Sequence, residues 1–217
     1  MERIICLVIG YVCGLFQTGY IIGKVHKTDI RDHGSGNAGT TNAFRTFGKK
    51  AGAITLLGDC LKCVLAIVIV RMVYGNSMNG ILPLLTLYAA LGCILGHNFP
   101  ISMEFRGGKG IAATAGLIIS TTNIWIVLIC LAAFIAIVAT TRYVSLGSMT
   151  VVTIYLISVI VYGQHGGFHM ENVAYLREMY GIAAFLMILA FWRHRANIKR
   201  LLSGTENKIS VGGKDKK

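Results

Sequence analysis

The run IAATAGLIISTTNIWIVLICLAAFIAIVA, residues 111–139, decides how many times this chain crosses a membrane. An α-helix rises about 1.5 Å per residue, so roughly 20 residues cross a hydrocarbon core about 30 Å thick. The run is longer than one such span, and its middle holds four turn-forming residues, Ser120, Thr121, Thr122 and Asn123. The pattern fits either one helix with a polar patch or a tight hairpin between two shorter helices.

The composition of the whole chain is typical of an integral membrane protein. Its 217 residues have a mean hydropathy of +0.65, 14% of them are charged, and only 2 are proline. A soluble domain of this composition would leave a large apolar surface in water. The net charge of +12 lies mainly between and after the apolar runs, so we expect no nucleic-acid partner. Residues 1–23 are expected to form a retained first span rather than a cleaved signal.

The positions of Lys and Arg distinguish the two interpretations of the long run. Short loops rich in these residues stay in the cytoplasm, and 17 of the 21 lie in 24–50, 101–110, Arg142 and 193–217. A break at 120–123 places all four groups on one face. We therefore predict an all-α integral membrane protein, a single-domain, seven-helix transmembrane bundle with its N-terminus outside and its C-terminus and active-site loops in the cytoplasm. The predicted spans are about 4–23, 51–73, 81–99, 111–120, 124–141, 143–163 and 177–192, followed by a basic tail at 203–217 whose end is expected to be flexible.

Three polar stretches fall on the predicted cytoplasmic face: GSGNAGTTNAFRTFGKK (34–50), EFRGGKGIAATAG (104–116) and RHRANIKRLLSGTENK (193–208). Glycine-rich backbone before a helix can offer N–H groups to phosphate. The N–H groups of 107–110 and the Lys109 ammonium are therefore expected to point at one phosphoryl group. The loop does not match a P-loop, because Met103 and Gly110 stand where Gly and Ser or Thr are needed, so ATP hydrolysis is not indicated.

The first and third stretches also carry groups suited to phosphate. Arg45 offers a planar fork of donors, and neutral hydrogen bonds are available from Ser35, Asn37, Thr40, Thr41 and Asn42. His194 and Asn197 are three residues apart on one helical face, and His194 could act as a general base or as a donor to phosphate. The alternatives are a solvated loop with capping residues and, for Arg193 to Arg195, interfacial snorkelling. The meeting of three such stretches on one face favours a site.

Ionisable residues also interrupt the apolar pattern of the second predicted span. Asp59 and Lys62 share one helical face, so they form either a structural ion pair or part of the active site. His97 ends the third predicted span and could help shape the site. The six cysteines lie inside apolar segments, so we expect no disulfide. No His or carboxylate cluster indicates a bound metal.

Taken together, the motifs resemble those of the PlsY family, the bacterial membrane acyl-phosphate:glycerol-3-phosphate acyltransferases. The resemblance covers nearly the whole chain through SGN (35–37) with TNAFRTFGKK (41–50), GDCLKC (58–63), GHNFP (96–100) with FRGGKG (105–110), YVSLGS (143–148) and HRANIKRLLSGTENK (194–208). One departure is Cys63, where the family is expected to have glycine. The resemblance implies transfer of a fatty acyl group from acyl phosphate to the 1-hydroxyl of sn-glycerol 3-phosphate. The products would be lysophosphatidic acid and phosphate, in the first step of bacterial phospholipid synthesis, with no cofactor and no metal.

The same resemblance implies roles for particular residues. The residues implied to be catalytic are Ser35, Arg45, Lys109, His194 and Asn197. The residues expected to bind the substrate phosphates are Asn37, Thr41, Asn42, Gly107, Gly108 and Gly110, with possible support from Asp59, Lys62 and His97. Acyl phosphate is already an activated donor, so no covalent acyl-serine is needed, and the substrate's own phosphate could accept the hydroxyl proton.

The implied setting is the bacterial inner membrane, with the site facing the cytoplasm and lipid around the bundle. A functional link to the phosphate acyltransferase that makes acyl phosphate is also implied. None of the six histidines has an Asp five positions later, so the His-Asp dyad of acyl-CoA-dependent relatives is not expected. The competing interpretations are an organic-phosphate transporter and a non-catalytic lipid-binding protein. The sequence shows no internal repeat of the kind that many transporters contain.

Overall fold

The computed structural model describes residues 1–170 and 172–209, and this part of the chain is helical with no strand. The α-helices are α1 (Glu2–Gly14), α2 (Thr18–Val25), α3 (Thr40–Phe47), α4 (Lys49–Tyr74), α5 (Leu82–Asn98), α6 (Ile111–Thr121), α7 (Ile124–Thr141), α8 (Val144–Gln164), α9 (Val173–Arg193) and α10 (Arg195–Leu202). Three short 3-10 helices occupy Ile30–Asp32, Asn79–Ile81 and Ile101–Met103. The prediction of an all-α membrane protein is confirmed.

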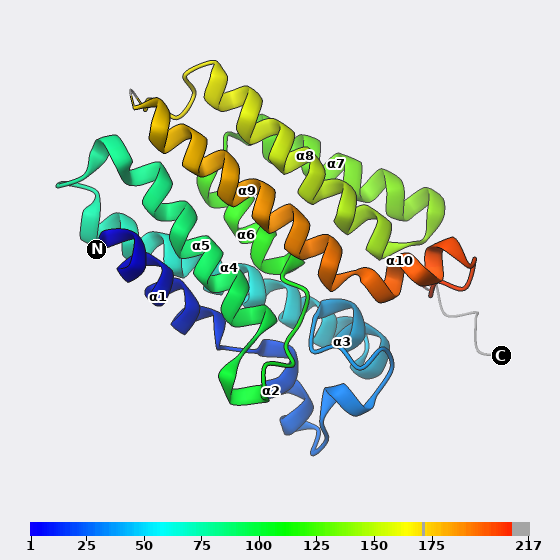
Figure 1. The fold of residues 1–217 in the computed structure, drawn as a ribbon. Coiled ribbons are helices and arrows are strands. Elements are labelled where there is room, and N and C mark those ends of the chain that lie inside the picture. Colours follow the sequence, from blue (N-terminus) through cyan, green and yellow to red (C-terminus); the bar gives the residue numbers. More distant parts are fainter. Residues whose placement is uncertain (171, 210–217) are drawn as a thin grey trace.

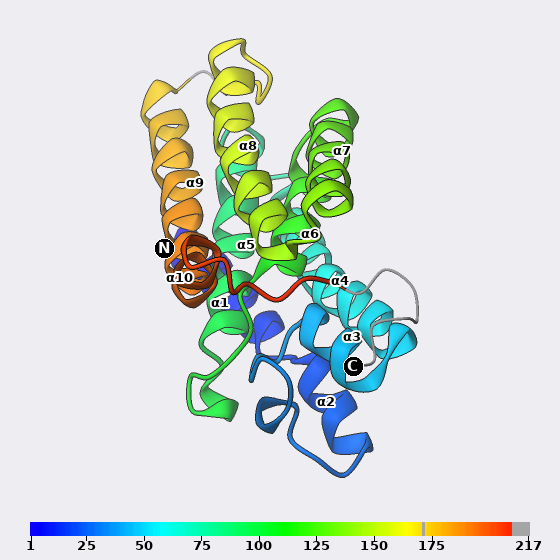
Figure 2. The same cartoon turned by 90° about the vertical axis from the view of Figure 1, so that its right-hand side faces the viewer.

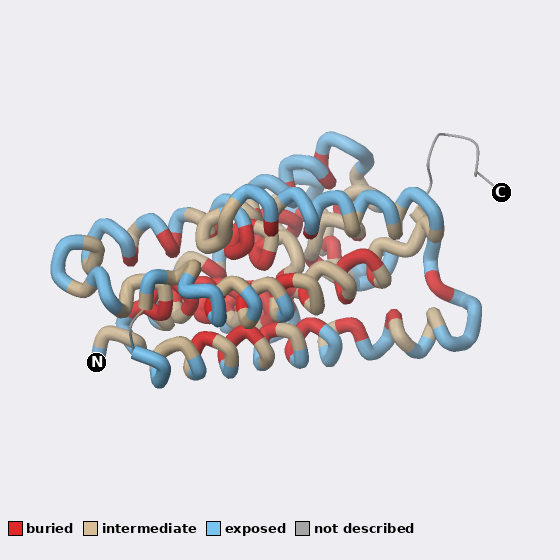
Figure 3. The backbone as a smooth tube through the Cα atoms, turned by 90° about the horizontal axis from the view of Figure 1, so that it is seen from above, coloured by how far each residue is buried: buried red, intermediate tan, exposed pale blue. Residues whose placement is uncertain are grey.

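Six helical segments are long and apolar enough to cross a membrane: Glu2–Val25, Lys49–Tyr74, Asn79–Met103, Ile124–Thr141, Val144–Gln164 and Val173–Arg193. The shorter α6 lies beside them and packs on α4 and α5. Figure 1 shows α7, α8 and α9 running side by side along the bundle. Many large apolar side chains point outward, and the buried positions gather in the interior (Figure 3). Such an outer surface suits lipid rather than water.

The chain breaks between α6 and α7, where the turn-forming cluster predicts it. Asn123 caps α7, because its Oδ1 accepts a hydrogen bond from the N–H of Ile126 at 3.0 Å. The Thr121 and Thr122 hydroxyls donate to the carbonyls of Leu117 and Ile118, four residues back, at 2.8 and 2.7 Å. The polar side chains therefore satisfy backbone groups at the ends of two helices.

The first predicted span differs from a single continuous helix. Leu15, Phe16 and Gln17 separate α1 from α2; the Gln17 side chain is buried, whereas that of Phe16 is exposed. Gln17 Nε2 donates to the carbonyls of Gly14, Gly96 and His97 at 3.0, 3.3 and 3.2 Å. The Lys62 ammonium donates to the Phe16 carbonyl at 2.6 Å. The break persists inside the protein because side chains replace the lost helical hydrogen bonds.

Small residues allow several helices to approach closely. A Cβ on Gly10 of α1 would lie 1.9 Å from the Ala89 carbonyl oxygen, and one on Gly92 of α5 would lie 2.0 Å from that of Leu7. On α6, a Cβ at Gly116 would lie 2.4 Å from the Cys60 carbonyl oxygen. Backbone contact of this kind is a usual way for membrane helices to associate. Cys63 is fully buried beside Gly116, so it does not prevent the close packing of α4 and α6.

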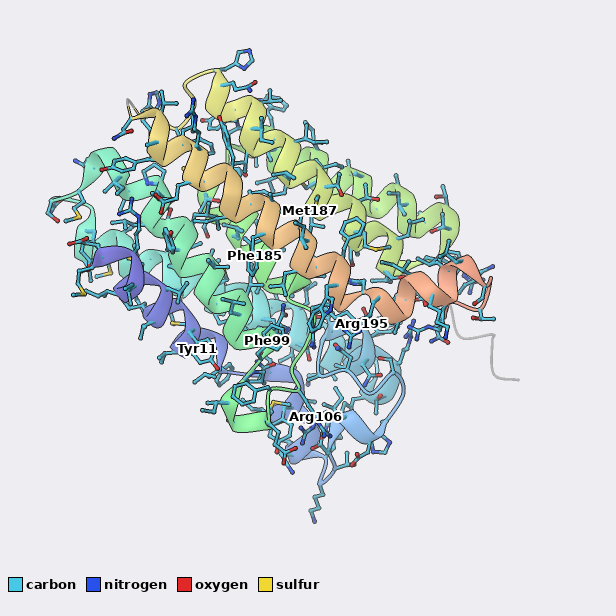
Figure 4. The ribbon with its side chains drawn as sticks, viewed as in Figure 1. Tyr11, Phe99, Arg106, Phe185, Met187 and Arg195 are labelled. Carbon is cyan, nitrogen blue, oxygen red and sulfur yellow. The ribbon has the colours of Figure 1, made fainter. Side chains whose placement is uncertain are left out.

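All three polar stretches lie at the end of the bundle that carries α2, α3 and α10, opposite the N-terminus (Figures 1 and 2). At this end the chain crosses from α5 into the 99–110 loop, and Tyr11 of α1 donates to the Phe99 carbonyl at 2.8 Å (Figure 4). The segment after α10 crosses towards α7, where the N–H of Ile209 donates to the Arg142 carbonyl at 2.9 Å. The predicted flexible end of the tail lies outside the described residues.

Close packing of α1 on α5 can be tested with glycine substitutions. Gly92→Ala should destabilise the protein by about 1–3 kcal/mol, because its methyl group would overlap backbone atoms of Leu7 and Tyr11. Gly181→Ala on α9 is the matched control, since nothing lies within 4 Å of its Cβ position. Thermal unfolding in detergent compares the two variants. Equal midpoints would contradict this account of the helix contact.

Candidate active site

A cavity of about 490 Å³ opens at the end of the bundle where the polar stretches meet. Its polar wall contains eleven of the fourteen residues proposed from the sequence: Ser35, Asn37, Thr41, Asn42, Arg45, Asp59, His97, Lys109, Gly110, His194 and Asn197. The three that do not line it are Lys62, Gly107 and Gly108. Its other wall is apolar and is formed by α4, α6, α7 and α8. The cavity therefore joins a polar compartment to a hydrophobic groove.

A chain of hydrogen bonds joins the second and third polar stretches. The Lys109 ammonium donates to Asn197 Oδ1, and Asn197 Nδ2 donates to Glu206 Oε1 at 2.7 Å. Ser145 Oγ donates to the same carboxylate oxygen at 2.9 Å, and Arg200 Nε donates to Oε2 at 2.8 Å. Glu206 thus orients Asn197, and Asn197 orients Lys109.

Glu206 and Ser145 are residues that the sequence analysis did not assign to the site. Glu206 is 8% exposed and collects donors from three different positions. Although burial raises the pKa of this carboxyl, the hydrogen bonds from Asn197, Arg200 and Ser145 outweigh it and hold the pKa below its usual value. One available signal was a single carboxylate among the basic residues of 193–208.

The cavity holds two cationic side chains that lack a carboxylate partner. Within residues 1–170 and 172–209, Asp59 pairs with Lys62 and Glu206 pairs with Arg200, while no ion pair joins Arg45 or Lys109 to a carboxylate. Burial lowers the pKa of Lys109 to about 8, and the positive charges of Arg200, Arg193 and Arg45 add to that effect. An anion in the cavity would reverse this penalty. The electrostatics therefore suit a negatively charged ligand.

The loop around Ser35 is held by Asn42 from the first turn of α3. Asn42 is 1% exposed, its Oδ1 accepts from the Ser35 N–H at 2.8 Å, and its Nδ2 donates to the Ile30 and His33 carbonyls. Asn42 thus shapes the loop, with both amide atoms engaged by the protein. Gly34 has a φ of +58°, and a Cβ there would lie 2.2 Å from Asn42 Oδ1. Arg45 follows on the same helix, and its Nη2 donates to the Asn207 carbonyl at 3.1 Å.

Two of the N–H groups in the loop at 107–110 do not form the cradle expected from the sequence. The N–H of Gly107 donates to the Asn98 carbonyl at 3.2 Å, and that of Gly108 donates to the His97 carbonyl at 3.1 Å. Both N–H groups are therefore engaged by the end of α5, so the expectation that they point at phosphate is wrong. A Cβ on Gly107 would lie 2.0 Å from the His97 oxygen, which explains the glycine by packing. Lys109 and Gly110 do face the cavity, just before α6 begins.

Arg193 holds the same loop from the other side. Its Nη2 donates to the carbonyls of Gly107 and Gly108 at 2.9 and 2.6 Å, and its Nε donates to Gly108 at 3.1 Å. Snorkelling to the membrane surface therefore does not describe this arginine. The loop that carries Lys109 is fixed between α5 and the end of α9.

His194 is buried at the junction of α9 and α10, with 2% of its surface exposed. Its Nδ1 lies 2.7 Å from the Ala190 carbonyl, so Nδ1 must donate and the proton of the neutral ring is on Nδ1. Burial, reinforced by the charge of Lys109, lowers the pKa of His194 to about 4. The ring is neutral at pH 7 with a lone pair on Nε2. It can therefore accept a hydrogen bond from a hydroxyl, whereas it has no proton on Nε2 to donate to phosphate.

Comparison with known proteins identifies the family of this chain. The model of the family described as glycerol-3-phosphate acyltransferase matches residues 4–204. The chain belongs to the glycerol-3-phosphate acyltransferase family. A glycerol-3-phosphate acyltransferase of Clostridioides difficile (strain 630) is 45% identical over 208 residues, covering 95% of both chains. One of Halalkalibacterium halodurans is 44% identical over 207 residues, covering 94% of both.

Two solved structures show the same fold as this acyltransferase family member. The crystal structure of PlsY, an integral membrane glycerol 3-phosphate acyltransferase, in its glycerol 3-phosphate form is 29% identical, with a TM-score of 0.81, and the match covers 97% of this chain and 96% of that one. The lysophosphatidic acid form is 28% identical with a TM-score of 0.79 and the same coverage. The family resemblance and the membrane fold expected from the sequence are thereby confirmed.

The hydrogen bonds that Glu206 accepts predict that its carboxylate stabilises the folded protein. Glu206→Gln removes the charge that receives hydrogen bonds from Asn197, Ser145 and Arg200, so we expect a loss of about 1.5–3 kcal/mol. Glu104→Gln is the control, because Glu104 is an exposed acid in the loop between α5 and α6. Chemical unfolding in detergent measures both. A Glu206→Gln variant as stable as the control would show that this carboxylate does not organise the site.

The lowered pKa of His194 predicts how the stability of the protein depends on pH. The unfolded histidine takes up a proton near its ordinary value of 6.5, whereas the folded one does so only near 4. Between these values the unfolded chain binds more protons, so this residue makes stability fall as the pH is lowered from 6.5 to 4. His194→Gln should show a smaller fall of its unfolding midpoint over that range than the wild type. Parallel curves for the two proteins would rule out a buried neutral His194.

Proposed function

We propose that the protein transfers a fatty acyl group from acyl phosphate to the 1-hydroxyl of sn-glycerol 3-phosphate, releasing lysophosphatidic acid and phosphate. The observation that carries this proposal is one cavity in which two cations, Arg45 and Lys109, form no ion pair with a carboxylate of the described residues and lie beside an apolar groove. Both substrates are phosphates, and one also carries a long hydrocarbon chain. The names of the family relatives support glycerol 3-phosphate as the acceptor.

The apolar wall supplies the environment that a fatty acyl chain requires. It is formed by Leu56 of α4, Ala112, Ala115, Ile118 and Ile119 of α6, Val127, Cys130, Leu131, Phe134 and Val138 of α7, and Val151 of α8. Each methylene buried here contributes about 0.8 kcal/mol of transfer free energy. An acyl chain in the groove would place its phosphate end among the cations at the cavity mouth.

The chemistry can then be assigned to named groups. The acceptor hydroxyl oxygen forms a bond to the acyl carbonyl carbon, and the bond from that carbon to the phosphate oxygen breaks. Lys109 and Arg45 stabilise the negative charge that develops on the carbonyl oxygen and the departing phosphate. Asn197 keeps Lys109 in place, and the Nε2 lone pair of His194 orients the hydroxyl. The hydroxyl proton passes to a phosphate of the substrates, so Ser35 serves to bind substrate and forms no acyl-enzyme.

The remaining residues of the polar wall complete the binding of phosphate. Asn37, Thr41 and Gly110 line the cavity and supply neutral hydrogen bonds beside the two cations. The first turn of α6 begins at this point, and its partial positive charge adds to the attraction for an anion. Asn42, Gly107 and Gly108 act one step away by shaping the loops that carry Ser35 and Lys109.

The basic end of the bundle is proposed to face the cytoplasm of a bacterial inner membrane. The Lys and Arg residues of 24–50, 101–110 and 193–209 lie at the end that holds the cavity. Acyl phosphate would reach the site from the phosphate acyltransferase that makes it, and the lipid product would leave through the groove. Among the described residues, no group of three or more His, Cys, Asp or Glu side chains is placed to hold a metal ion. The proposed reaction requires neither metal nor cofactor.

Purified protein supplied with palmitoyl phosphate and glycerol 3-phosphate should release inorganic phosphate and form the acylated product. Lys109→Met, which keeps the apolar stem and removes the charge, should lower kcat/KM about 100- to 1,000-fold. Lys50→Met is the matched control, because the Lys50 side chain is exposed and does not line the cavity. A folded wild-type protein without turnover would contradict the proposed reaction. Full activity in Lys109→Met would remove this lysine from the mechanism.

A further inference from the structure

His97 lines the same cavity, although it lies outside the three polar stretches. It is the residue before the last of α5, and only 2% of its surface is exposed. In the sequence it could only be assigned a supporting part in shaping the site. The contacts of its two ring nitrogens point to a more specific role.

The Nδ1 atom of His97 lies 2.8 Å from the Lys62 ammonium. Lys62 also lies 2.9 Å from Asp59 Oδ1 and 2.6 Å from the Phe16 carbonyl oxygen. Lys62 forms an ion pair with Asp59, and an ammonium group can only donate hydrogen bonds. Nδ1 must therefore be the acceptor. The neutral ring then carries its proton on Nε2, which is the opposite tautomer from that of His194.

The Nε2 atom lies against the loop that carries Lys109. A Cβ on Gly108 would lie 2.0 Å from His97 Nε2, so only glycine leaves room for the ring tip. Within the part of the chain that the structure describes, this N–H has no hydrogen-bond acceptor. His97 borders the cavity, so a bound ligand can supply the acceptor that these residues do not. The ring therefore offers an N–H group to whatever occupies the cavity.

We propose that the Nε2–H group of His97 binds a phosphate oxygen of the substrate. This inference rests on the proposed function for the nature of the ligand, because Arg45 and Lys109 make the same cavity suitable for phosphate. Lys62 is then a positioning residue, since it acts through His97 by fixing the tautomer. Asp59 is its counterion, and Thr18 donates to that carboxylate at 3.3 Å. The sequence allowed Asp59 and Lys62 to be either a structural ion pair or part of the active site, and this proposal gives the pair a role in binding.

Two substitutions of similar size separate the functions of the two ring nitrogens. The amide of Asn reaches the position of Nδ1, whereas the amide of Gln reaches the position of Nε2. His97→Gln should therefore keep kcat/KM within about 10-fold of the wild type, and His97→Asn should lose on the order of 100-fold. Thermal unfolding of both variants checks that they are folded. Equal losses in two folded variants would overturn the inference.

The kinetics also distinguish which phosphate is bound. A KM that rises in His97→Asn for glycerol 3-phosphate alone assigns the contact to the acceptor, and one that rises for palmitoyl phosphate alone assigns it to the donor. A fall of kcat with both KM values unchanged would contradict ground-state binding of phosphate. Because these comparisons use wild-type turnover as the reference, an inactive wild type would count against the proposed reaction and not against His97.

Nuclear magnetic resonance of protein labelled with ¹⁵N-histidine tests the inference without turnover and without a His97 variant. The His97 ring should show the Nε2–H tautomer, and its proton should shift when glycerol 3-phosphate or inorganic phosphate is added. Glycerol at the same concentration is the control ligand. In Lys62→Met, the preference for the Nε2–H form should be lost. A ring protonated on Nδ1 in the wild type, or no response to either phosphate, would overturn the proposal.

Discussion

The arrangement of the helices at the polar end of this bundle depends on the hydrogen bonds of the Lys62 ammonium group. Lys62 lies on α4, yet it binds the Phe16 carbonyl between α1 and α2, the Asp59 carboxylate and the His97 ring at the end of α5. A charge at this depth is tolerated only when it has several acceptors. It therefore fixes three helical segments relative to one another. The backbone carbonyl of His97 in turn accepts a hydrogen bond from the N–H of Gly108 and so positions the loop that carries Lys109.

A second polar centre performs the corresponding task at the cavity mouth. Glu206 comes from the segment after α10, and it joins that segment to α8 through Ser145 and to α10 through Asn197 and Arg200. Lys109 and Arg45 remain without a carboxylate of their own among the described residues. Asp59 pairs with Lys62 and Glu206 pairs with Arg200. Arg45 and Lys109 are thus left for a ligand. This division of charges suits the cavity to an anion beside a hydrocarbon groove.

The two buried histidines carry their ring protons on different nitrogens, because one contacts a backbone carbonyl and the other contacts an ammonium group. His194 donates from Nδ1 to the Ala190 carbonyl, which leaves an acceptor on Nε2. His97 accepts at Nδ1 from Lys62, which leaves a donor on Nε2. One ring suits a hydroxyl and the other suits a phosphate oxygen. In the reaction proposed above, glycerol 3-phosphate carries both of these groups.

The sequence by itself determined the helical class, the break at 120–123 and the gathering of the basic segments at one end of the bundle, because these follow from local hydropathy, turn formers and charge. It also determined most residues of the cavity wall, because their types and spacing match one family. Only the tertiary structure decided how the N–H groups of Gly107 and Gly108 are used, since their acceptors lie at the end of α5. The same holds for the break at Gln17 and for Glu206, whose partners come from other helices. Local patterns predict which groups are available, and packing between distant segments decides which of them remain free for a ligand.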